Sequence, residues 1–271
     1  MEPQEFLRAP LGALQTPVCR IGLSATYRPG RETLYKALDE GLNYFFFFGI
    51  DTQMTRVLRE LPPGWRDQVV LATGAYNYIV AHQNLRRTLE KRLRQLKTDY
   101  IDLFHFLGVT KPKQFTPQVR EELAAVRASG LVRGVSISTH DRKFAAELAR
   151  DGVVDAVMIR YNAAHRGAET EIFPQLVPNG PAVVSYTATR WTALIRRPRG
   201  YPKQDRIPTA GQCYRFVLSN PAVHVCLMAP GNRKQFESNL AEIRRGPLAG
   251  DEMEFMRGFG DVVYRRYKYF M

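Results

Sequence analysis

The sequence of 271 residues predicts an α/β protein that folds as a single (β/α)8 barrel, also called a TIM barrel. Short apolar runs alternate with amphipathic segments along the chain, and eight such runs are each followed by a helical pattern. Barrels of this kind typically occupy about 250 residues. No linker or internal repeat divides the sequence, so we expect one domain over residues 1–271, with a C-terminal extension from about 247 to 271.

The eight apolar runs are the expected barrel strands, because parallel strands that are buried on both faces are apolar along most of their length. A doubly wound sheet is the alternative arrangement. No Gly-x-Gly-x-x-Gly motif follows the first strand, which argues against the dinucleotide-binding form of that sheet. In chain order the runs are Arg20–Ala25, Asn43–Phe48, Val69–Thr73, Tyr100–Leu107, Val132–Ser136, Val154–Ile159, Ala182–Tyr186 and Val223–Met228.

The segments between these runs have helical periodicity. Leu85, Leu89, Leu93 and Leu96 recur at helical spacing, with Arg and Lys on the opposite face. A second apolar stripe at this spacing follows Asn232, a residue type suited to cap a helix N-terminus. In a barrel built this way, chemistry is expected where the strands run into the loops that follow them.

The chain is basic, with 39 Lys and Arg against 26 Asp and Glu and a formal charge of +13. Such a charge attracts polyanions, including the phosphates of a nucleotide cofactor. The basic residues are spread along helices and form few dense clusters, the densest being 190–206. We therefore interpret most of them as solvated surface, and a nucleic-acid partner is not expected.

Several features indicate a protein of a reducing compartment, and we expect a cytoplasmic location. The first ten residues lack the pattern of a signal peptide, and no apolar stretch approaches the roughly 18 residues of a membrane span. Cys19, Cys213 and Cys226 are widely separated, which indicates neither a disulfide framework nor a metal cluster. The sequence contains no signal for an oligomeric state.

Several motifs resemble those of the aldo-keto reductase superfamily. The sequence GLNYF at 41–45 is similar to the family's entry to strand two. LRRTLE at 85–90 with TDYIDL at 98–103 is similar to its helix three and strand four. GLVRGVS at 130–136 resembles Gly-Lys-Val-Arg-Ala-Ile-Gly-Val-Ser with one residue dropped. The resemblance covers roughly residues 18–245, and it implies an eightfold barrel that binds a nicotinamide cofactor without a Rossmann fold.

The family's reaction uses an Asp, a Tyr, a Lys and a His, and this tetrad is not matched. The Asp falls on Phe46, the Lys on Gly74 and the His on Leu107, while the Tyr falls near Asp51. Without the Lys, a buried Asp would be an unpaired charge, so an apolar residue is the less costly neighbour. The resemblance therefore implies a proton relay that is altered or lost.

The cofactor site of the family is partly matched, which implies that NADP(H) can bind. Ser136 matches the Ser that holds the nicotinamide amide, and Tyr186 matches the ring that stacks on nicotinamide. Any aromatic residue at 186 can equally be barrel core. Thr187 and Thr189 lie on the loop that holds the pyrophosphate in the family.

A second group of matched residues is expected at the cofactor's phosphate and adenine end. Gly231 and Asn232 open the last barrel helix, whose amide groups and dipole suit an anion. Arg233, together with Arg190 on the preceding loop, supplies positive charge for a phosphate. Asn239 matches the family's adenine-contacting Asn.

Four residues near the expected barrel mouth are candidates for catalysis. Asp51 can act as a general base if its loop points it inward, and it can equally cap the following helix. Tyr76 offers a phenol after the position of the missing Lys. Arg160 offers a planar donor fork for a carboxylate or phosphate. His105 shares a strand face with Leu107 but lies one layer deeper, so it is either catalytic or core.

Three functions remain open at this point. The first is an oxidoreductase of the aldo-keto reductase fold with an altered proton donor, and we adopt it because fold and cofactor features support it. The second is a barrel enzyme repurposed for a non-redox reaction of the lyase, cyclase or hydrolase type. The third is a non-catalytic ligand-binding protein. In each case the expected ligand is a small anionic or aromatic molecule, and no metal is expected.

Overall fold

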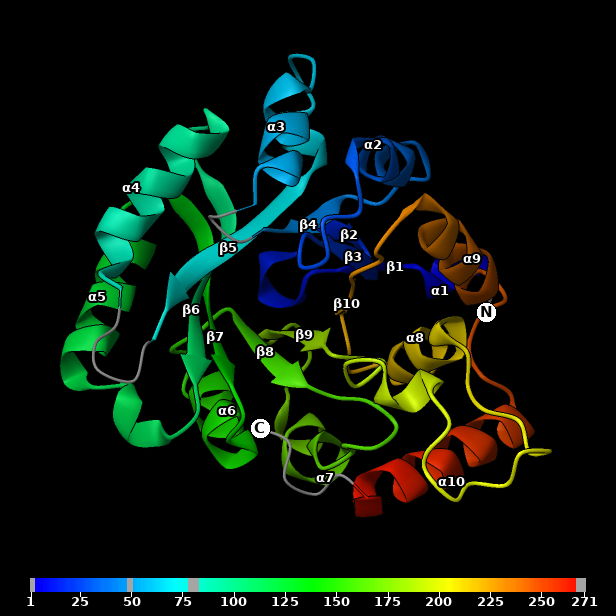
Figure 1. The fold of residues 1–271 in the computed structure, drawn as a ribbon. Helices are drawn as coiled ribbons and strands as arrows, with labels where there is room; N and C mark the ends of the chain where they lie inside the picture. Colours follow the sequence, from blue (N-terminus) through cyan, green and yellow to red (C-terminus); the bar gives the residue numbers. More distant parts are fainter. Residues whose placement is uncertain (1–2, 48–50, 78–82, 267–271) are drawn as a thin grey trace.

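Eight parallel strands close into a barrel in the computed structural model, which describes residues 3–47, 51–77 and 83–266 (Figure 1). Each predicted run overlaps one strand, so the predicted barrel is confirmed, although four strands extend beyond the C-terminal ends of their predicted runs. Residue 48 of the second run lies outside the described residues. Around the barrel the order is β10, β3, β4, β5, β6, β7, β8, β9. The strands are β3 (Ile21–Ser24), β4 (Tyr44–Phe46), β5 (Val70–Tyr76), β6 (Ile101–Val109), β7 (Val132–Thr139), β8 (Ala156–Arg160), β9 (Ala182–Tyr186) and β10 (Val225–Met228).

Helices follow the strands and surround the barrel (Figure 1). Polar side chains cap several of them: Asn84, Asp141 and Asn232 each accept a backbone N–H of the first turn, as the sequence predicts for Asn232. None of the described helices is both long and apolar enough to cross a bilayer. The helices are α1 (Pro3–Phe6), α2 (Arg31–Asp39), α3 (Gln53–Glu60), α4 (Leu85–Leu96), α5 (Pro117–Ala128), α6 (Arg142–Arg150), α7 (Ala168–Glu171), α8 (Ala210–Leu218), α9 (Arg233–Ile243) and α10 (Gly250–Arg266).

Helix α10 occupies the predicted C-terminal extension, of which residues 267–271 lie outside the described residues. Its side chains Met256, Phe259 and Val263 are buried, so this helix packs on the barrel as part of the outer layer of helices. Arg257 of α10 binds Glu169 of α7 through two hydrogen bonds of 3.0 and 2.9 Å. The extension is therefore joined to the segment that follows β8.

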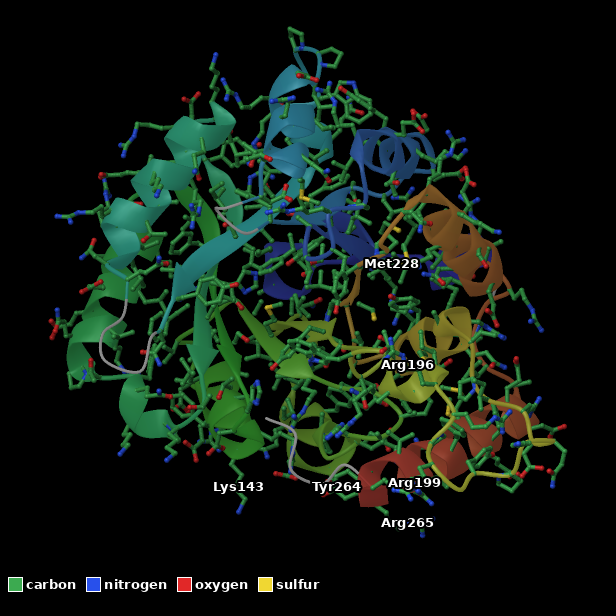
Figure 2. The ribbon with its side chains drawn as sticks, in the orientation of Figure 1. Lys143, Arg196, Arg199, Met228, Tyr264 and Arg265 are labelled. Atoms are coloured by element: carbon green, nitrogen blue, oxygen red, sulfur yellow. The ribbon has the colours of Figure 1, made fainter. Side chains whose placement is uncertain are left out.

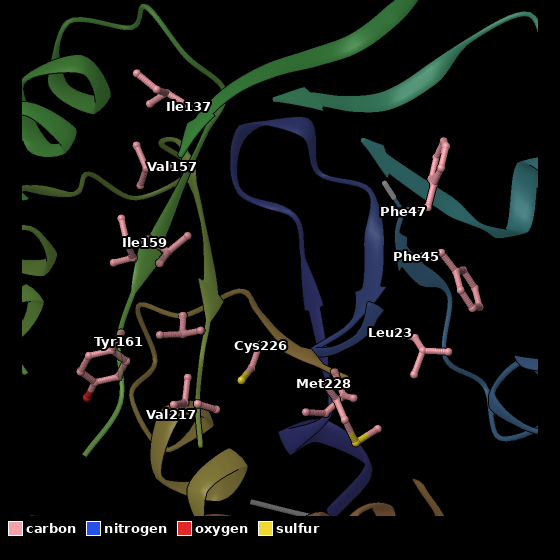
Figure 3. Close-up of a cluster of buried hydrophobic side chains, with 14 of the residues drawn as sticks. Leu23, Phe45, Phe47, Ile137, Val157, Ile159, Tyr161, Val217, Cys226 and Met228 are labelled. Atoms are coloured by element: carbon pink, nitrogen blue, oxygen red, sulfur yellow. The ribbon is translucent and has the colours of Figure 1, made fainter. Parts of the chain in front are cut away.

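Two apolar layers result from strand alternation. Side chains such as Ile137, Ile159 and Cys226 point outward and pack under the helices (Figure 3). Side chains such as Phe46, Leu103 and Val184 point inward and fill the barrel. The interior is thus a packed core at this level, as in other barrels of eight strands, and it opens only toward one end.

The hairpin of β1 (Arg8–Pro10) and β2 (Pro17–Cys19) closes the N-terminal end of the barrel. Leu11 and Val18 belong to the same buried cluster as the inward-facing strand residues. The amide of Ala13 donates to the carbonyl of Gly180, just before β9, over 2.8 Å. This plug leaves the opposite, C-terminal ends of the strands as the open end.

Two motif carboxylates join neighbouring strands. Asp102 in β6 accepts the amide of Leu71 in β5 over 2.9 Å and pairs with Arg66 over 2.8 Å. Asp155, just before β8, accepts the amide of Val135 in β7 over 2.9 Å. Because both carboxylates bind backbone groups of an adjacent strand, these motif positions are tied to the fold and carry no information on the reaction.

Candidate functional site

A cavity of about 320 Å³ lies at the open end of the barrel. All eight strands contribute to its wall near their C-terminal ends, which is where barrel enzymes carry their active sites. The lining residues are Ser24, Thr26, Tyr27, Phe46, Tyr76, Leu107, Gly108, Ser138, His140, Met158, Tyr186, Thr187, Ala188, Thr189, Trp191, Tyr214, Leu227 and Ala229.

Aromatic rings dominate the wall of this cavity. Tyr76, Tyr186 and Phe46 come from strand ends, Tyr214 comes from α8, and Trp191 comes from the loop after β9. Trp191 is 58% exposed, so it stands at the rim. Flat apolar walls with a few polar groups suit a planar ring, and pockets for small organic ligands have this composition.

Tyr186 ends β9 at the cavity wall. Its ring lies 6.2 Å from the imidazole of His140, at an interplanar angle of 37°. Burial raises the pKa of Tyr186 to about 12, with Arg160 and Ser138 acting in the opposite direction. Its hydroxyl is buried and makes no hydrogen bond of normal geometry among the described residues. The phenol is therefore neutral at pH 7.

Ser138, and not Ser136, faces the cavity. Both serines lie on the inward face of β7, but Ser136 is fully buried one layer deeper, and its hydroxyl has no hydrogen-bond partner among the described residues. The reason lies in the motif at 130–138. Aligned without a gap, the nine residues Gly-Lys-Val-Arg-Ala-Ile-Gly-Val-Ser end on Ser138. The prediction for Ser136 therefore depended on a dropped residue that the strand does not require.

The loop after β9 has an unusual backbone. Thr187, Arg190, Trp191 and Thr192 have positive φ angles of 57°, 49°, 54° and 72°. Left-handed backbone is disfavoured for residues with a Cβ, and most of all for β-branched ones, so strain accumulates beside the cavity. Thr187 and Thr189 line the cavity as the cofactor prediction requires, whereas Arg190 is 4% exposed and lies outside its wall.

His105 lies inside the barrel, below the cavity. It is completely buried, its ring stands edge-on to Phe46 at 5.5 Å, and neither ring nitrogen has a hydrogen-bond partner among the described residues. Burial alone lowers the pKa of His105 to about 3. The imidazole is therefore neutral at pH 7, and the structure favours the core interpretation over the catalytic one.

Asp51 is placed at a helix and away from the cavity wall. Its Oδ1 accepts the amide of Met54 over 2.7 Å, and its carbonyl accepts the hydroxyl of Thr55 over 2.7 Å. Burial raises the pKa of this carboxyl, and the hydrogen bonds act in the opposite direction. The general-base hypothesis for Asp51 is not supported by this placement, because the side chain is used to cap α3.

Three positions of the expected tetrad can be located. Phe46 and Leu107 line the cavity with apolar side chains. Gly74 lies on the inward face of β5, where a Cβ would come within 2.1 Å of the carbonyl oxygen of His105 in β6. The two strands approach so closely here that no side chain fits at residue 74 without a backbone shift.

The residues predicted for the cofactor's phosphate end lie at the N-terminus of α9, which follows the cavity residue Ala229. Gly231 donates its amide to Gln235 Oε1 over 2.8 Å, and Asn232 Oδ1 accepts the amide of Gln235 over 3.0 Å. The helix start is thus partly capped by its own side chains. Arg233 pairs with Glu237 over 2.8 Å, and Asn239 lies 3.7 Å from the sulfur of Met228.

Tyr76 ends β5 and Arg160 ends β8, and the two residues differ in their relation to the cavity. Tyr76 lines it directly. Arg160 ends β8 directly opposite Tyr186 of β9 and is half-buried beside the wall. His140 and Tyr214, which also line the cavity, escaped sequence reasoning. Tyr214 belongs to a helix, and no periodicity signals that a helix side chain reaches the mouth.

Comparisons with known proteins agree with the barrel. A family model described as the aldo/keto reductase family matches residues 32–260. The solved holo form of aldo-keto reductase AKR11C1 from Bacillus halodurans superposes with a TM-score of 0.74 at 20% identity. That match covers 93% of this chain and 95% of that one. At this identity the structural likeness concerns the fold alone.

Two curated relatives match shorter segments. Aldo-keto reductase YhdN of Bacillus subtilis (strain 168) is 27% identical over 171 residues, which are 57% of this chain and 50% of that protein. The NADH-specific methylglyoxal reductase of Escherichia coli (strain K12) is 26% identical over 108 residues, 39% of this chain and 33% of that protein. The matched segments thus span half or less of these relatives.

Proposed function

The chain belongs to the aldo-keto reductase family, and we propose that it is an oxidoreductase that binds NADP(H) at the barrel mouth and acts there on a small molecule without the family's usual proton relay. The observation that carries the proposal is the aromatic-walled cavity bounded by all eight strands, with Tyr186 on one side. The relatives named as reductases favour redox chemistry over a lyase or hydrolase reaction.

The residues at the mouth fit a nicotinamide cofactor. Tyr186 offers a flat ring and a buried hydroxyl that has no hydrogen-bond partner among the described residues, and an amide of a ligand can satisfy it. Ser138 and Thr187 add hydroxyl groups on the same wall. Bound there, the cofactor would supply or accept a hydride. Arg233 and the first amides of α9 follow the cavity residue Ala229 in the chain, and we propose that they hold the cofactor's phosphates.

The chain's own part in the reaction is to exclude water and to donate a hydrogen bond to a carbonyl oxygen. Phe46, Leu107 and Trp191 supply the apolar enclosure. Among the donors of the wall, we assign this role to the phenol of Tyr76 and the imidazole of His140. Burial and Arg160 lower the pKa of His140, so this ring is neutral at pH 7 and donates without bringing a charge.

Support for an altered relay comes from Gly74. A lysine at this position would collide with the backbone of β6 before its amine reached the cavity. Since a phenol titrates near 10 and needs a cationic neighbour to give up its proton readily, Tyr76 works as a hydrogen-bond donor more readily than as a strong acid. We therefore propose slow turnover compared with members that have the complete tetrad.

Single-turnover hydride transfer tests the proposal. Protein is mixed with NADPH or NADH and a panel of small aldehydes and ketones, and loss of the reduced nicotinamide is followed by absorbance. We expect Tyr76→Phe or His140→Gln to slow the transfer by about 10²-fold or more, as removal of a general acid typically does, while Tyr35→Phe on the distant helix α2 leaves it unchanged. Unchanged rates in both mouth variants would exclude these two donors.

A further inference from the structure

We propose that a basic face, built from the loop after β9 and the C-terminal end of α10, binds the phosphate backbone of a single-stranded nucleic acid. Five exposed side chains define this basic face: Arg196, Arg199, Lys203, Arg265 and Arg266. None of the five lines the cavity at the barrel mouth. The inference is therefore independent of the reaction proposed for that cavity.

The fold brings together two basic segments that are far apart in the sequence. A Cβ at Gly200 would lie 3.4 Å from a guanidinium nitrogen of Arg266, so the loop passes directly beside the end of the helix. Arg199 and Arg265 lie near the same end of α10 in Figure 2. The spread of basic residues along the sequence argued against a nucleic-acid partner, whereas in the fold these residues share one surface.

The loop is held against α10, and its basic side chains remain exposed. The ring of Tyr201 stands edge-on to Phe259 of α10 at 5.1 Å. Arg197 donates to the carbonyl oxygens of Pro202 and Asp205, the second over 2.7 Å, and so braces the loop across its turn. The cations are thus positioned before a ligand arrives, which lowers the entropy lost on binding.

The charge of the basic face is not balanced by neighbouring carboxylates. None of its five side chains has an ion pair among the described residues. Asp261 of α10 is paired with Arg166 over 2.6 Å, and the other acidic residues of α10 lie in its N-terminal half. Asp205 is the acidic residue of the loop, and it is exposed. An incoming anion therefore meets a net positive charge.

The composition of the basic face favours a nucleic acid over a membrane or an acidic protein. Contacts from Arg and Lys to closely spaced phosphates supply most of the affinity of sequence-independent binding. Among the described residues of the loop and α10, Tyr264 is the exposed large hydrophobic side chain, at 44%. A surface that enters a membrane or a protein interface needs several such anchors.

Tyr264 also favours a single strand over a duplex. Its ring borders the basic face next to Arg265 and is held edge-on to His165 at 5.6 Å. An unpaired base can stack on such a ring, and stacking of this kind is independent of base identity. In a duplex the base faces are covered by their neighbours, so the ring would contribute nothing.

Fluorescence anisotropy with a fluorescein-labelled oligo(dT) of about 20 nucleotides tests the proposal. We expect saturable binding at about 50 mM salt and an affinity that falls as salt is raised. Contacts from all five cations to phosphates would give a slope of about −3.5 for the logarithm of the association constant against that of the salt concentration. No binding at about 50 mM salt, or binding that salt leaves unchanged, would overturn the proposal.

Removal of charge locates the contact. A triple variant with Arg199→Gln, Arg265→Gln and Arg266→Gln should bind the oligonucleotide at least about tenfold more weakly, and its salt slope should be shallower by about 2, because three phosphate contacts are lost. The corresponding triple lysine variant should retain most of the affinity, because lysine also binds phosphate. Unaltered affinity in the triple glutamine variant would contradict the proposal.

A matched control removes the same charge elsewhere. Arg56→Gln, Arg59→Gln and Lys91→Gln alter exposed residues of α3 and α4, on the other side of the barrel (Figure 1). Binding should change by less than about twofold, because salt screens charges that are far from the site. Equal losses in the two triple variants would mean that the net charge of +13 acts as a whole, and would overturn the proposal.

Tyr264 variants test the strand type. Tyr264→Leu should weaken binding about tenfold and leave the salt slope unchanged, whereas Tyr264→Phe should bind normally, because the ring supplies the stacking surface. Unchanged affinity in Tyr264→Leu would overturn the assignment to a single strand.

Two other anions separate the possible sources of phosphate. The triple glutamine variant should bind NADPH like the original protein, and a parallel loss of NADPH affinity would assign the basic face to the cofactor. Binding to vesicles of phosphatidylserine and phosphatidylcholine, without binding to the oligonucleotide, would assign it to a membrane. Either result would overturn the proposal. If NADPH binds to none of the proteins, the proposed redox function fails, while the oligonucleotide titrations still decide this inference.

Discussion

His105 shows how a single buried side chain separates stability from function. Its two ring nitrogens have no hydrogen-bond partner among the described residues, and its pKa is about 3 against an ordinary value of 6.5. The unfolded chain therefore binds a proton at this residue at pH values where the folded chain does not. The contribution to stability is complete above about pH 6.5 and is lost as the pH falls from there toward 3.

Replacing this histidine by leucine should therefore make the protein less sensitive to acid. We expect His105→Leu to flatten the decline of the unfolding midpoint between pH 6.5 and 4, measured by urea denaturation. At pH 7 the free energy of unfolding should be unchanged or higher. The substitution removes two buried polar atoms without hydrogen-bond partners, and leaving such a group buried and unsatisfied costs about 1–3 kcal/mol. A large loss of stability at pH 7 would show that the imidazole is satisfied by a buried water and contradict this account.

Asp51 illustrates the opposite case, a polar residue near the mouth whose role is local. Its carboxylate caps the first turn of α3 through the amide of Met54. Asp51→Ala should lower the free energy of unfolding by about 1 kcal/mol, the typical value of a lost N-cap, and should leave the NADPH affinity unchanged. A loss of turnover without a loss of stability would restore the general-base hypothesis.

At the scale of elements, the loop after β9 combines a strained backbone with residues that line the cavity. Thr192 is β-branched and has a φ of 72°, a conformation that glycine adopts without penalty. Thr192→Gly should raise the stability of the protein by up to about 1 kcal/mol, since left-handed backbone costs non-glycine residues about 1–2 kcal/mol and glycine adds chain entropy on unfolding. It should also weaken NADPH binding, because the loop that carries the cavity residues Thr187 and Thr189 becomes less rigid.

Lys97 provides the matched control for this loop. It has a φ of 54° at the C-terminal end of α4, far along the chain from the loop after β9. Lys97→Gly should give a comparable gain in stability with no change in NADPH affinity. If both variants changed binding equally, strain in the loop after β9 would have no particular connection with the site.

The close approach of strands β5 and β6 at Gly74 also belongs to the scale of elements. A Cβ at residue 74 would meet the carbonyl oxygen of His105 at 2.1 Å. Gly74→Ala should therefore destabilise the protein by several kcal/mol or displace β5, since overpacking forces backbone shifts. Gly74→Lys should be at least as damaging and should not increase aldehyde reduction. A stable Gly74→Lys protein with raised activity would contradict the account of the altered relay.

For the whole molecule, the barrel could be predicted from alternation and length because each strand and helix has a local pattern. The residues of the candidate site were harder to predict from the sequence. His140 and Tyr214 face the cavity only through long-range packing, and the close approach at Gly74 depends on two strands at once. Ser138 was within reach, since the motif at 130–138 aligns without a gap.

The surface charge is likewise a property of the whole molecule. Many basic residues, including Arg199 and Arg265 in Figure 2, lie toward the C-terminal helix and the loop before α8. Others are paired on the surface, as are Arg86 with Glu90 and Arg244 with Glu40. Exposed pairs of this kind contribute little stability, so the net charge of +13 says more about which ligands approach than about the fold.

The central claim is that the mouth of this barrel binds a nicotinamide cofactor, and a direct titration tests it. NADPH and NADH are added at low salt to the Trp65→Phe protein, in which Trp191 is the remaining tryptophan, and the fluorescence emission of Trp191 is followed. We predict saturable quenching by at least one of the two nucleotides, retained in Tyr186→Phe and weakened in Tyr186→Leu, because the ring and not the hydroxyl supplies the stacking surface. No saturable response to either nucleotide up to millimolar concentration would contradict the claim.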